Sequence, residues 1–181
     1  MVVWRSSVVD HWGSSSDERR ATYPCDGLIE DADVVFRAVD VDAPTPLLFR
    51  WMCQLRRAPY SYDWIDNLGR QSPRHLSDGL DDLEVGQHFM TIFRLISFDA
   101  GSSITLSSSS AMFGRVVCTY KAIPIEAGQS RLVVKLMFSA PPGLRGWITR
   151  RVLPAGDLLM MRKQLLTLKR LVERDSLQLG L

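Results

Sequence analysis

The sequence predicts an α+β fold in which a curved antiparallel sheet wraps around one long C-terminal helix. Two observations carry this prediction. Residues 87–139 alternate between apolar and polar side chains in several short runs, as the strands of a half-buried sheet do. One long amphipathic pattern follows them, from about Leu153 to Arg174. Because an apolar sheet face needs another element to cover it, we expect this helix to lie across the sheet.

The segments before the strand-rich region predict one strand and two short helices. Residues 1–32 look like an irregular N-terminal extension, and residues 33–41, "DVVFRAVDV", form the first strand. The prolines of "DAPTP" suit the first turn of a helix that runs to about Leu55. A second short helix is expected over residues 62–68, with Ser61 as its N-cap. The length of the chain predicts a single domain over residues 1–181.

Four further strands are predicted at about 87–98, 102–108, 113–122 and 130–139. The third strand places Val116, Cys118 and Tyr120 on one face. The fourth does the same with Val134 and Leu136. Charged residues alternate with them, which predicts one apolar face and one face open to solvent. Residues 70–86 are turn-rich and acidic, and they read as a loop.

The long helix carries an apolar stripe that should face the sheet. Its members recur three and four residues apart: Leu158, Met161, Leu165, Leu168 and Val172. A sheet curved around such a stripe leaves a space between the two elements. Four large rings lie close together in the sequence and on the segments that would close one end of this space: Trp51, Tyr60, Tyr62 and Trp64. They either seal the core or edge a cavity, and the sequence leaves both interpretations open.

The chain resembles a known protein superfamily. Four stretches carry the resemblance: "HWGSSSDERRATYPCDGL", "FRAVDVDAPTPLLFRWMCQL", "PYSYDWIDNLG" and "GDLLMMRKQLLTLKRLVE". They are similar to the SRPBCC proteins, the START-like and birch-pollen-allergen-like helix-grip superfamily that includes polyketide cyclases. The resemblance implies an elongated apolar cavity that binds or transforms lipids, sterols, polyketides or aromatic metabolites. The chain departs from the family in showing four clear strands after the second short helix, where six are usual.

The leading functional hypothesis is therefore the binding of a small apolar molecule, without a cofactor, in the cavity between sheet and C-terminal helix. The residues expected to line this cavity are Trp51, Tyr62, Trp64, Phe93, Val116, Cys118, Tyr120, Val134, Leu136, Leu158, Met161 and Leu165. The competing hypothesis is an enzyme of the cyclase, dehydratase or isomerase type. Its acid–base groups would come from four candidates: His88, Tyr62, Asp63 and Arg94.

A third hypothesis is a partner-binding or membrane-associated accessory protein, because "RGWITRR" (residues 145–151) mixes basic and aromatic side chains. Other classes find no support in the sequence. The net charge of +2 and the lack of binding motifs argue against nucleic acid. The three histidines and three cysteines show no metal-ligand spacing. No signal peptide or apolar run of membrane-spanning length is present, so we expect the cytosol. The sequence does not decide whether the protein forms a homodimer.

Overall fold

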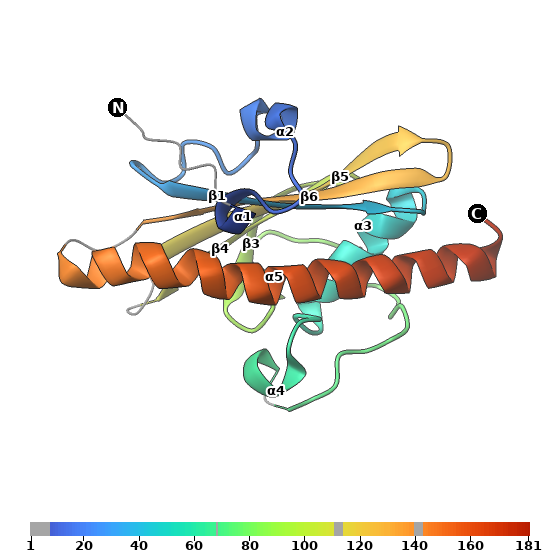
Figure 1. Cartoon of the computed structure of the whole chain (residues 1–181). Helices are drawn as coiled ribbons and strands as arrows, with labels where there is room; N and C mark the ends of the chain where they lie inside the picture. The colour runs from blue at the N-terminus through green and yellow to red at the C-terminus, as the bar shows by residue number, and fades with distance from the viewer. Residues whose placement is uncertain (1–7, 68, 111–113, 140–142) are drawn as a thin grey trace.

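The structure of the protein is a computed structural model, and it describes residues 8–67, 69–110, 114–139 and 143–181. An antiparallel sheet of six strands lies along one long helix (Figure 1). The strand order is β1-β6-β5-β4-β3-β2, so the first strand pairs with the last. The strands are β1 (Asp33–Val41), β2 (His88–Phe89), β3 (Phe93–Asp99), β4 (Ser103–Ser110), β5 (Gly114–Glu126) and β6 (Gln129–Phe138). The predicted helix-grip architecture is confirmed.

One predicted strand is wrong. Residues 87–98 do not form a single strand, because the chain reverses between β2 and β3. Met90 and Thr91 make this reversal with φ values of 44° and 69°. Left-handed backbone is normally adopted by glycine or asparagine, so neither residue signalled a turn. The described residues thus hold five strands after the short helices, and residues 70–86 contain no helix or strand, as predicted.

The segment between β1 and β2 holds the short helices α3 (Thr45–Cys53), η1 (Gln54–Arg56) and α4 (Asp63–Asp66). Pro46 occupies the first turn of α3, where its missing N–H is harmless. Helix α4 is shorter than predicted. Its N-cap is Tyr62 without a side-chain hydrogen bond, so the prediction that Ser61 caps this helix is wrong.

Helix α5 (Leu144–Leu179) is longer than the sequence predicts at both ends. Pro154 lies inside it, whereas proline usually marks the first turn. The carbonyl of Pro154 accepts a hydrogen bond from Arg37 Nη2 at 3.1 Å, which ties the helix to β1. The apolar stripe faces the sheet as predicted, and Leu165, Leu168 and Val172 are fully buried.

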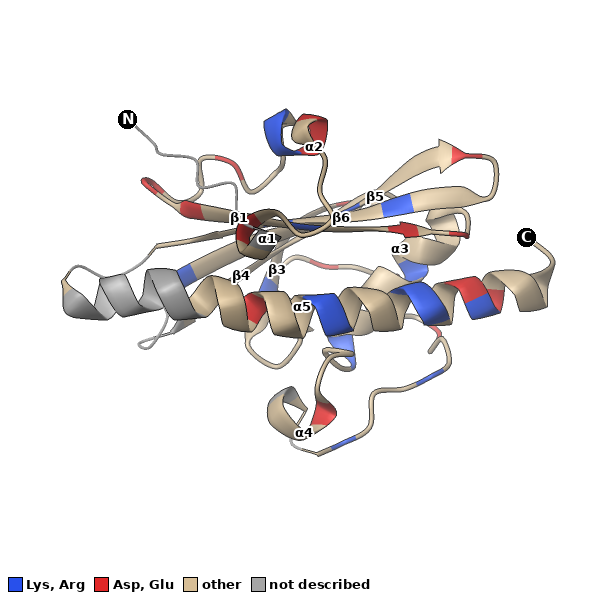
Figure 2. Ribbon diagram, viewed as in Figure 1, with Lys and Arg blue, Asp and Glu red and all other residues tan. Residues whose placement is uncertain are grey.

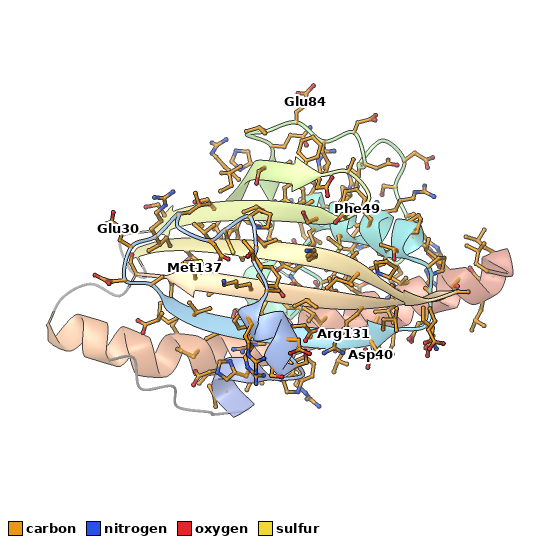
Figure 3. The ribbon with its side chains drawn as sticks, turned by 90° about the horizontal axis from the view of Figure 1, so that it is seen from above. Glu30, Asp40, Phe49, Glu84, Arg131 and Met137 are labelled. Atoms are coloured by element: carbon orange, nitrogen blue, oxygen red, sulfur yellow. The ribbon has the colours of Figure 1, made fainter. Side chains whose placement is uncertain are left out.

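The opposite face of the sheet is not open to solvent, and this prediction is wrong. The N-terminal segment begins with α1 (Val8–His11) at the β1 edge of the sheet, and α2 (Ser16–Arg20) and the residues after it cross the opposite face (Figures 1 and 3). A second apolar core lies there, made of Tyr23, Cys25, Ile29, Phe36, Ala38, Val117, Val133 and Met137. The N-terminal residues are therefore a layer of the fold.

Two charged residues of β6 hold this N-terminal layer in place. Arg131 pairs with Glu18 and Asp40, and its Nη2 donates to the carbonyl of Gly13 at 2.6 Å (Figure 3). Lys135 pairs with Asp26. These side chains looked like a solvated face because their partners lie far away in the sequence, so the alternation alone did not reveal them.

Two further observations concern the cysteines and membrane-spanning helices. Cys25, Cys53 and Cys118 are buried and free. Within the described ranges, no helix combines the length and apolarity that crossing a bilayer requires.

Candidate functional site: a cavity between sheet and helix

A cavity of about 190 Å³ lies between the sheet and α5. Three groups of residues line it: the strands β5 and β6 on one side, α5 on the other, and the segments around Pro59 and Met90 at the rim. The lining residues are Pro59, Ser61, Met90, Ile92, Phe93, Cys118, Tyr120, Leu136, Asp157, Met160, Met161 and Gln164. Most of this lining is apolar, and the polar groups are few, as in small-molecule sites.

The local structure explains why these side chains meet. Cys118 and Tyr120 are two positions apart in β5, so they point to the same face. Leu136 is the cross-strand partner of Cys118 in β6 and shares that face. On α5, Asp157, Met161 and Gln164 are three to four residues apart and so form one row. Sheet and helix thus each present a row of lining residues to the space between them.

A hydrogen-bonded chain crosses the cavity from strand to helix. The Tyr120 hydroxyl donates to Gln164 Oε1 at 2.7 Å, and Gln164 Nε2 donates to the carbonyl of Pro59 at 2.6 Å. The sulfur of Met90 lies 3.1 Å from Gln164 Nε2, and that of Met161 lies 3.5 Å from the Tyr120 hydroxyl. Tyr120 therefore has its proton committed, while its oxygen can still accept a hydrogen bond.

A buried ion pair forms the other polar part of the site. Arg37 Nη2 lies 2.8 Å from Asp157 Oδ2, and the two side chains are 1% and 12% exposed. Arg37 also donates to the carbonyl of Phe36 at 2.8 Å. Among the described residues, neither Arg37 Nε nor Asp157 Oδ2 has an aligned hydrogen-bond partner. Asp157 thus lines the cavity with its carboxylate held beside the Arg37 guanidinium.

Burial shifts the acidity of the cavity groups. Desolvation raises the pKa of Asp157 to about 6, although the nearby Arg37 guanidinium opposes this shift. Burial also raises the pKa of Tyr120 well above its ordinary value, and that of Cys118 likewise. The phenol and the thiol therefore stay protonated at neutral pH. Asp157 is the lining group whose pKa comes close to neutrality, which suits it to act as an acid or a base.

Five of the predicted lining residues lie on this cavity: Phe93, Cys118, Tyr120, Leu136 and Met161. The other seven lie elsewhere. Trp51, Val134 and Leu165 are completely buried in the core. Val116 and Leu158 are half-buried, and Val116 packs against the edge of that core.

The aromatic cluster divides between the core and the surface. Trp51 donates from Nε1 to Asp175 Oδ2 at 3.0 Å, and its ring packs edge-on against Tyr60. Tyr62 is half-buried at the start of α4, and Trp64 is 76% exposed on that helix. Tyr60 precedes the helix with a φ of 56°, so it does not share a helical face with Trp64. None of the four rings lines the cavity described above.

The four predicted acid–base candidates do not meet in the cavity. His88 and Arg94 are cross-strand neighbours in β2 and β3, both exposed, and Arg94 Nη1 donates to the carbonyl of Gly86 at 3.1 Å. The Asp63 carboxylate accepts hydrogen bonds from the backbone N–H and the hydroxyl of Ser72. Tyr62 lies beside Asp63 in the chain, so the candidates form two pairs outside the cavity.

Sequence reasoning missed three polar residues of the site: Arg37, Asp157 and Gln164. A signal for each was present. Asp157 and Gln164 fall on the apolar stripe of α5, four before and three after Met161. Arg37 lies between Val35 and Val39 on the apolar face of β1, two residues from each. A charge on each of two facing apolar stripes predicts a buried pair, because an unpaired charge there would be costly.

Two further sequence-based interpretations concern the membrane surface and metal binding. The side chains of residues 145–151, on which the membrane-surface hypothesis rests, lie outside the described residues. Across the described part of the chain, no group of three His, Cys, Asp or Glu side chains is arranged to hold a metal ion.

Comparison with known proteins gives a likeness of structure alone. No family model and no curated protein matches the sequence. The Zhui aromatase/cyclase from Streptomyces sp. R1128 superposes with a TM-score of 0.52 at 15% identity, over 79% of this chain and 94% of that one. The protein TTHA0849 from Thermus thermophilus gives 0.52 at 16% identity, over 80% and 99%. The protein CV1439 from Chromobacterium violaceum gives 0.50 at 15% identity, over 78% and 98%. Together with the six-stranded sheet and its long helix, these matches show that the chain has the helix-grip fold.

Proposed function

We propose that the protein binds a small, ring-bearing apolar molecule in the cavity between the sheet and α5. The observation that carries this proposal is the contrast within the lining. The walls are apolar, while Tyr120, Gln164 and Asp157 offer hydrogen-bonding groups from two facing elements. Apolar walls supply affinity, and a few fixed polar groups select and orient the ligand.

The volume of the cavity limits the size of this ligand. A dry cavity of about 150 Å³ is enough to hold benzene. The space here, about 190 Å³, suits one ring or two fused rings with a polar substituent. Three lining methionines, Met90, Met160 and Met161, have flexible side chains and let the walls adapt to somewhat larger shapes. A long lipid would need the walls to move apart.

Filling the cavity should weaken ligand binding strongly. In the variant Met161→Trp the indole occupies the ligand space, and we expect the affinity for 2-naphthol to fall at least about tenfold. The naphthol fluorescence titration measures this directly. Leu159→Trp is the matched control, because Leu159 lies two residues away on α5 and is 59% exposed.

Two outcomes would contradict the proposal. One is a wild-type protein that shows no saturable binding of 2-naphthol or of a panel of one- and two-ring compounds. The other is a Met161→Trp variant that binds as tightly as Leu159→Trp while both remain folded. Circular dichroism of each variant separates loss of binding from loss of structure.

One observation favours a second function, that of a ring-modifying enzyme. Asp157 lies in the apolar lining with a pKa raised to about 6, so it can exchange a proton with a ligand near neutral pH. One solved structure of the same fold is an aromatase/cyclase. In this hypothesis Asp157 moves the proton, Arg37 holds its carboxylate in place, and Tyr120 orients the substrate.

The variant Asp157→Asn tests this second function. The ligand extracted from the purified protein, identified by mass spectrometry, is incubated with wild type and variant. Conversion by wild type that Asp157→Asn loses, while ligand affinity stays within about threefold, would favour an enzyme. Unchanged ligand in both samples would leave simple binding as the function.

A further inference from the structure

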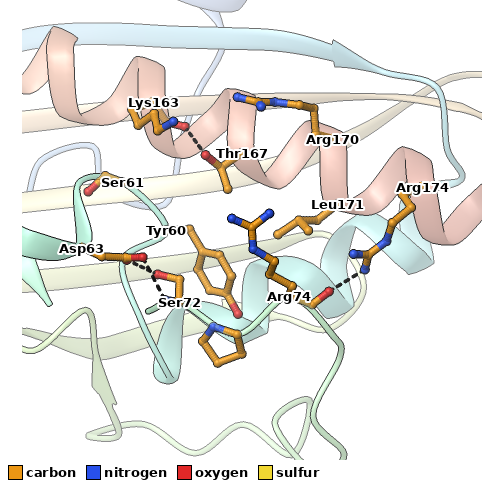
Figure 4. Close-up of a pocket in the computed structure, with 11 residues that line it drawn as sticks. Tyr60, Ser61, Asp63, Ser72, Arg74, Lys163, Thr167, Arg170, Leu171 and Arg174 are labelled. Carbon is orange, nitrogen blue, oxygen red and sulfur yellow. Dashed lines mark hydrogen bonds between the residues drawn. The ribbon is translucent and has the colours of Figure 1, made fainter. Parts of the chain in front are cut away.

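A second depression lies on the outer side of α5, between that helix and the loop that follows α4. It measures about 330 Å³ and is separate from the cavity described above, although Ser61 borders both. Four of its lining side chains are basic, namely Arg74, Lys163, Arg170 and Arg174, and one, Asp63, is acidic (Figure 4). The whole chain carries a net charge of only +2, so this depression concentrates positive charge. Figure 2 shows basic residues both along α5 and in the facing loop.

Most of these cations have no anionic partner within the described part of the chain. Among the ion pairs of the described residues, none involves Arg74, Lys163 or Arg170. Arg170 donates from Nε to the carbonyl of Leu166 at 3.2 Å, which leaves its two terminal nitrogens for another partner. Evolved surfaces usually intersperse both signs of charge, because like charges repel one another. An uncompensated group of this kind implies an anion from outside the chain.

The loop that carries Arg74 is held against α5. Arg174 pairs with Asp175, and its Nη2 also donates to the carbonyl of Arg74 (Figure 4). On the other side, both oxygens of Asp63 accept hydrogen bonds from Ser72. The acidic group is thus engaged within the loop, and the basic side chains from loop and helix are positioned around one space.

The floor of the depression adds an independent observation. Tyr60 lines it and is 1% exposed, yet its hydroxyl has no hydrogen-bond partner among the described residues. Burial raises the pKa of Tyr60 to about 12, so the group remains an O–H donor. A buried donor without an acceptor is rare in proteins and calls for one, such as a bound anion or water. Tyr60 also keeps a left-handed backbone at φ 56°, a conformation of the kind found at ligand sites.

We propose that this depression is an anion site that binds a phosphate group, with Lys163 and Arg170 of α5 and Arg74 of the facing loop as its ligands. A phosphate carries up to two negative charges and several acceptor oxygens, which matches a cluster of guanidinium and ammonium donors better than a single carboxylate does. The phosphate belongs either to a soluble compound or to a lipid headgroup, since the recognising chemistry is the same. This site is independent of ring binding in the cavity.

The test compares two double variants that remove the same charges from the same helix. Lys163→Gln/Arg170→Gln removes two cations from the depression. Arg162→Gln/Lys169→Gln is the matched control, because Arg162 lies over the Trp12 ring and Lys169 pairs with Glu173 instead. Inorganic phosphate is titrated at constant ionic strength and followed by NMR. We expect the first variant to weaken phosphate binding about tenfold or more and the control to stay within about twofold.

A second arm distinguishes the two sources of the phosphate. Vesicles of phosphatidylcholine, with and without phosphatidic acid, are sedimented with each protein. Loss of phosphatidic-acid-dependent sedimentation in Lys163→Gln/Arg170→Gln, but not in the control, supports a headgroup. Saturable inorganic phosphate binding without sedimentation supports a soluble phosphate compound. The proposal is overturned if wild type binds neither, or if both double variants weaken binding equally, which would indicate a general charge effect.

Discussion

Replacing Arg37 with methionine will lower the free energy of unfolding by about 3–5 kcal/mol at pH 8, because the change leaves the buried Asp157 carboxylate without its cation. Chemical denaturation followed by circular dichroism measures the loss. The double variant Arg37→Met/Asp157→Leu should recover most of it, since two apolar side chains replace the whole pair. Recovery in the double variant would separate the cost of an unpaired charge from the cost of lost packing.

The penalty of Arg37→Met should depend on pH. The pKa of Asp157 rises from 3.8 in the unfolded chain to about 6 in wild type, so wild-type folding loses stability as the pH rises through that window. Without Arg37 the folded-state pKa goes higher still, because Arg37 is the group that lowers it. The difference between wild type and variant therefore grows above about pH 6. An equal penalty at pH 5 and pH 8 would contradict the ion pair as the cause.

Replacing Trp51 with alanine will also destabilise the protein strongly, by about 3–5 kcal/mol, because a large fully buried ring leaves a cavity in the core. The variant further loses the hydrogen bond from Trp51 Nε1 to Asp175. Trp64→Ala is the matched control. Trp64 is 76% exposed, and we expect its removal to change stability by less than about 0.5 kcal/mol.

Urea denaturation of the two alanine variants also decides what the aromatic cluster does. If Trp51 only edged a ligand space, its truncation would change affinity more than stability. A Trp51→Ala variant of near wild-type stability would therefore show that the packing described here is wrong. Ligand affinity of Trp64→Ala should stay unchanged, because Trp64 lies outside the cavity.

Much of the fold could be predicted from the sequence because its signals are local. The alternation in 113–122 and 130–139 placed Cys118, Tyr120 and Leu136 on one face, and the structure brings them together. The apolar stripe from Leu158 to Val172 predicted the helix that covers this face. Period-2 and period-3.6 patterns are properties of short segments, so one sequence suffices to read them.

The parts that sequence reasoning missed depend on distant partners or unusual backbone. Met90 and Thr91 turn the chain without glycine or asparagine, so the β2–β3 hairpin went unrecognised. Arg131 and Lys135 bind the N-terminal layer from more than a hundred residues away. The aromatic residues cluster in the sequence, but the fold divides them between the core and the surface. The polar residues of the cavity, such as Asp157, lie within apolar sequence patterns, and such patterns predict core packing and not a polar site.

A methyl NMR spectrum of the methionines, recorded during titration with 2-naphthol, shows whether the ligand binds between the sheet and α5. Met90, Met160 and Met161 line the cavity between sheet and helix. Met52 and Met137 are buried in the two apolar cores and serve as internal controls. All five residues give the same kind of methyl signal, so one sample measures the lining residues and the controls together.

Binding in this cavity predicts saturable shifts of the Met90, Met160 and Met161 methyl signals, with those of Met52 and Met137 unchanged. Binding in this cavity would be contradicted if the three lining methyl signals stayed in place while naphthol bound, or if all five moved together as in a general loosening of the fold.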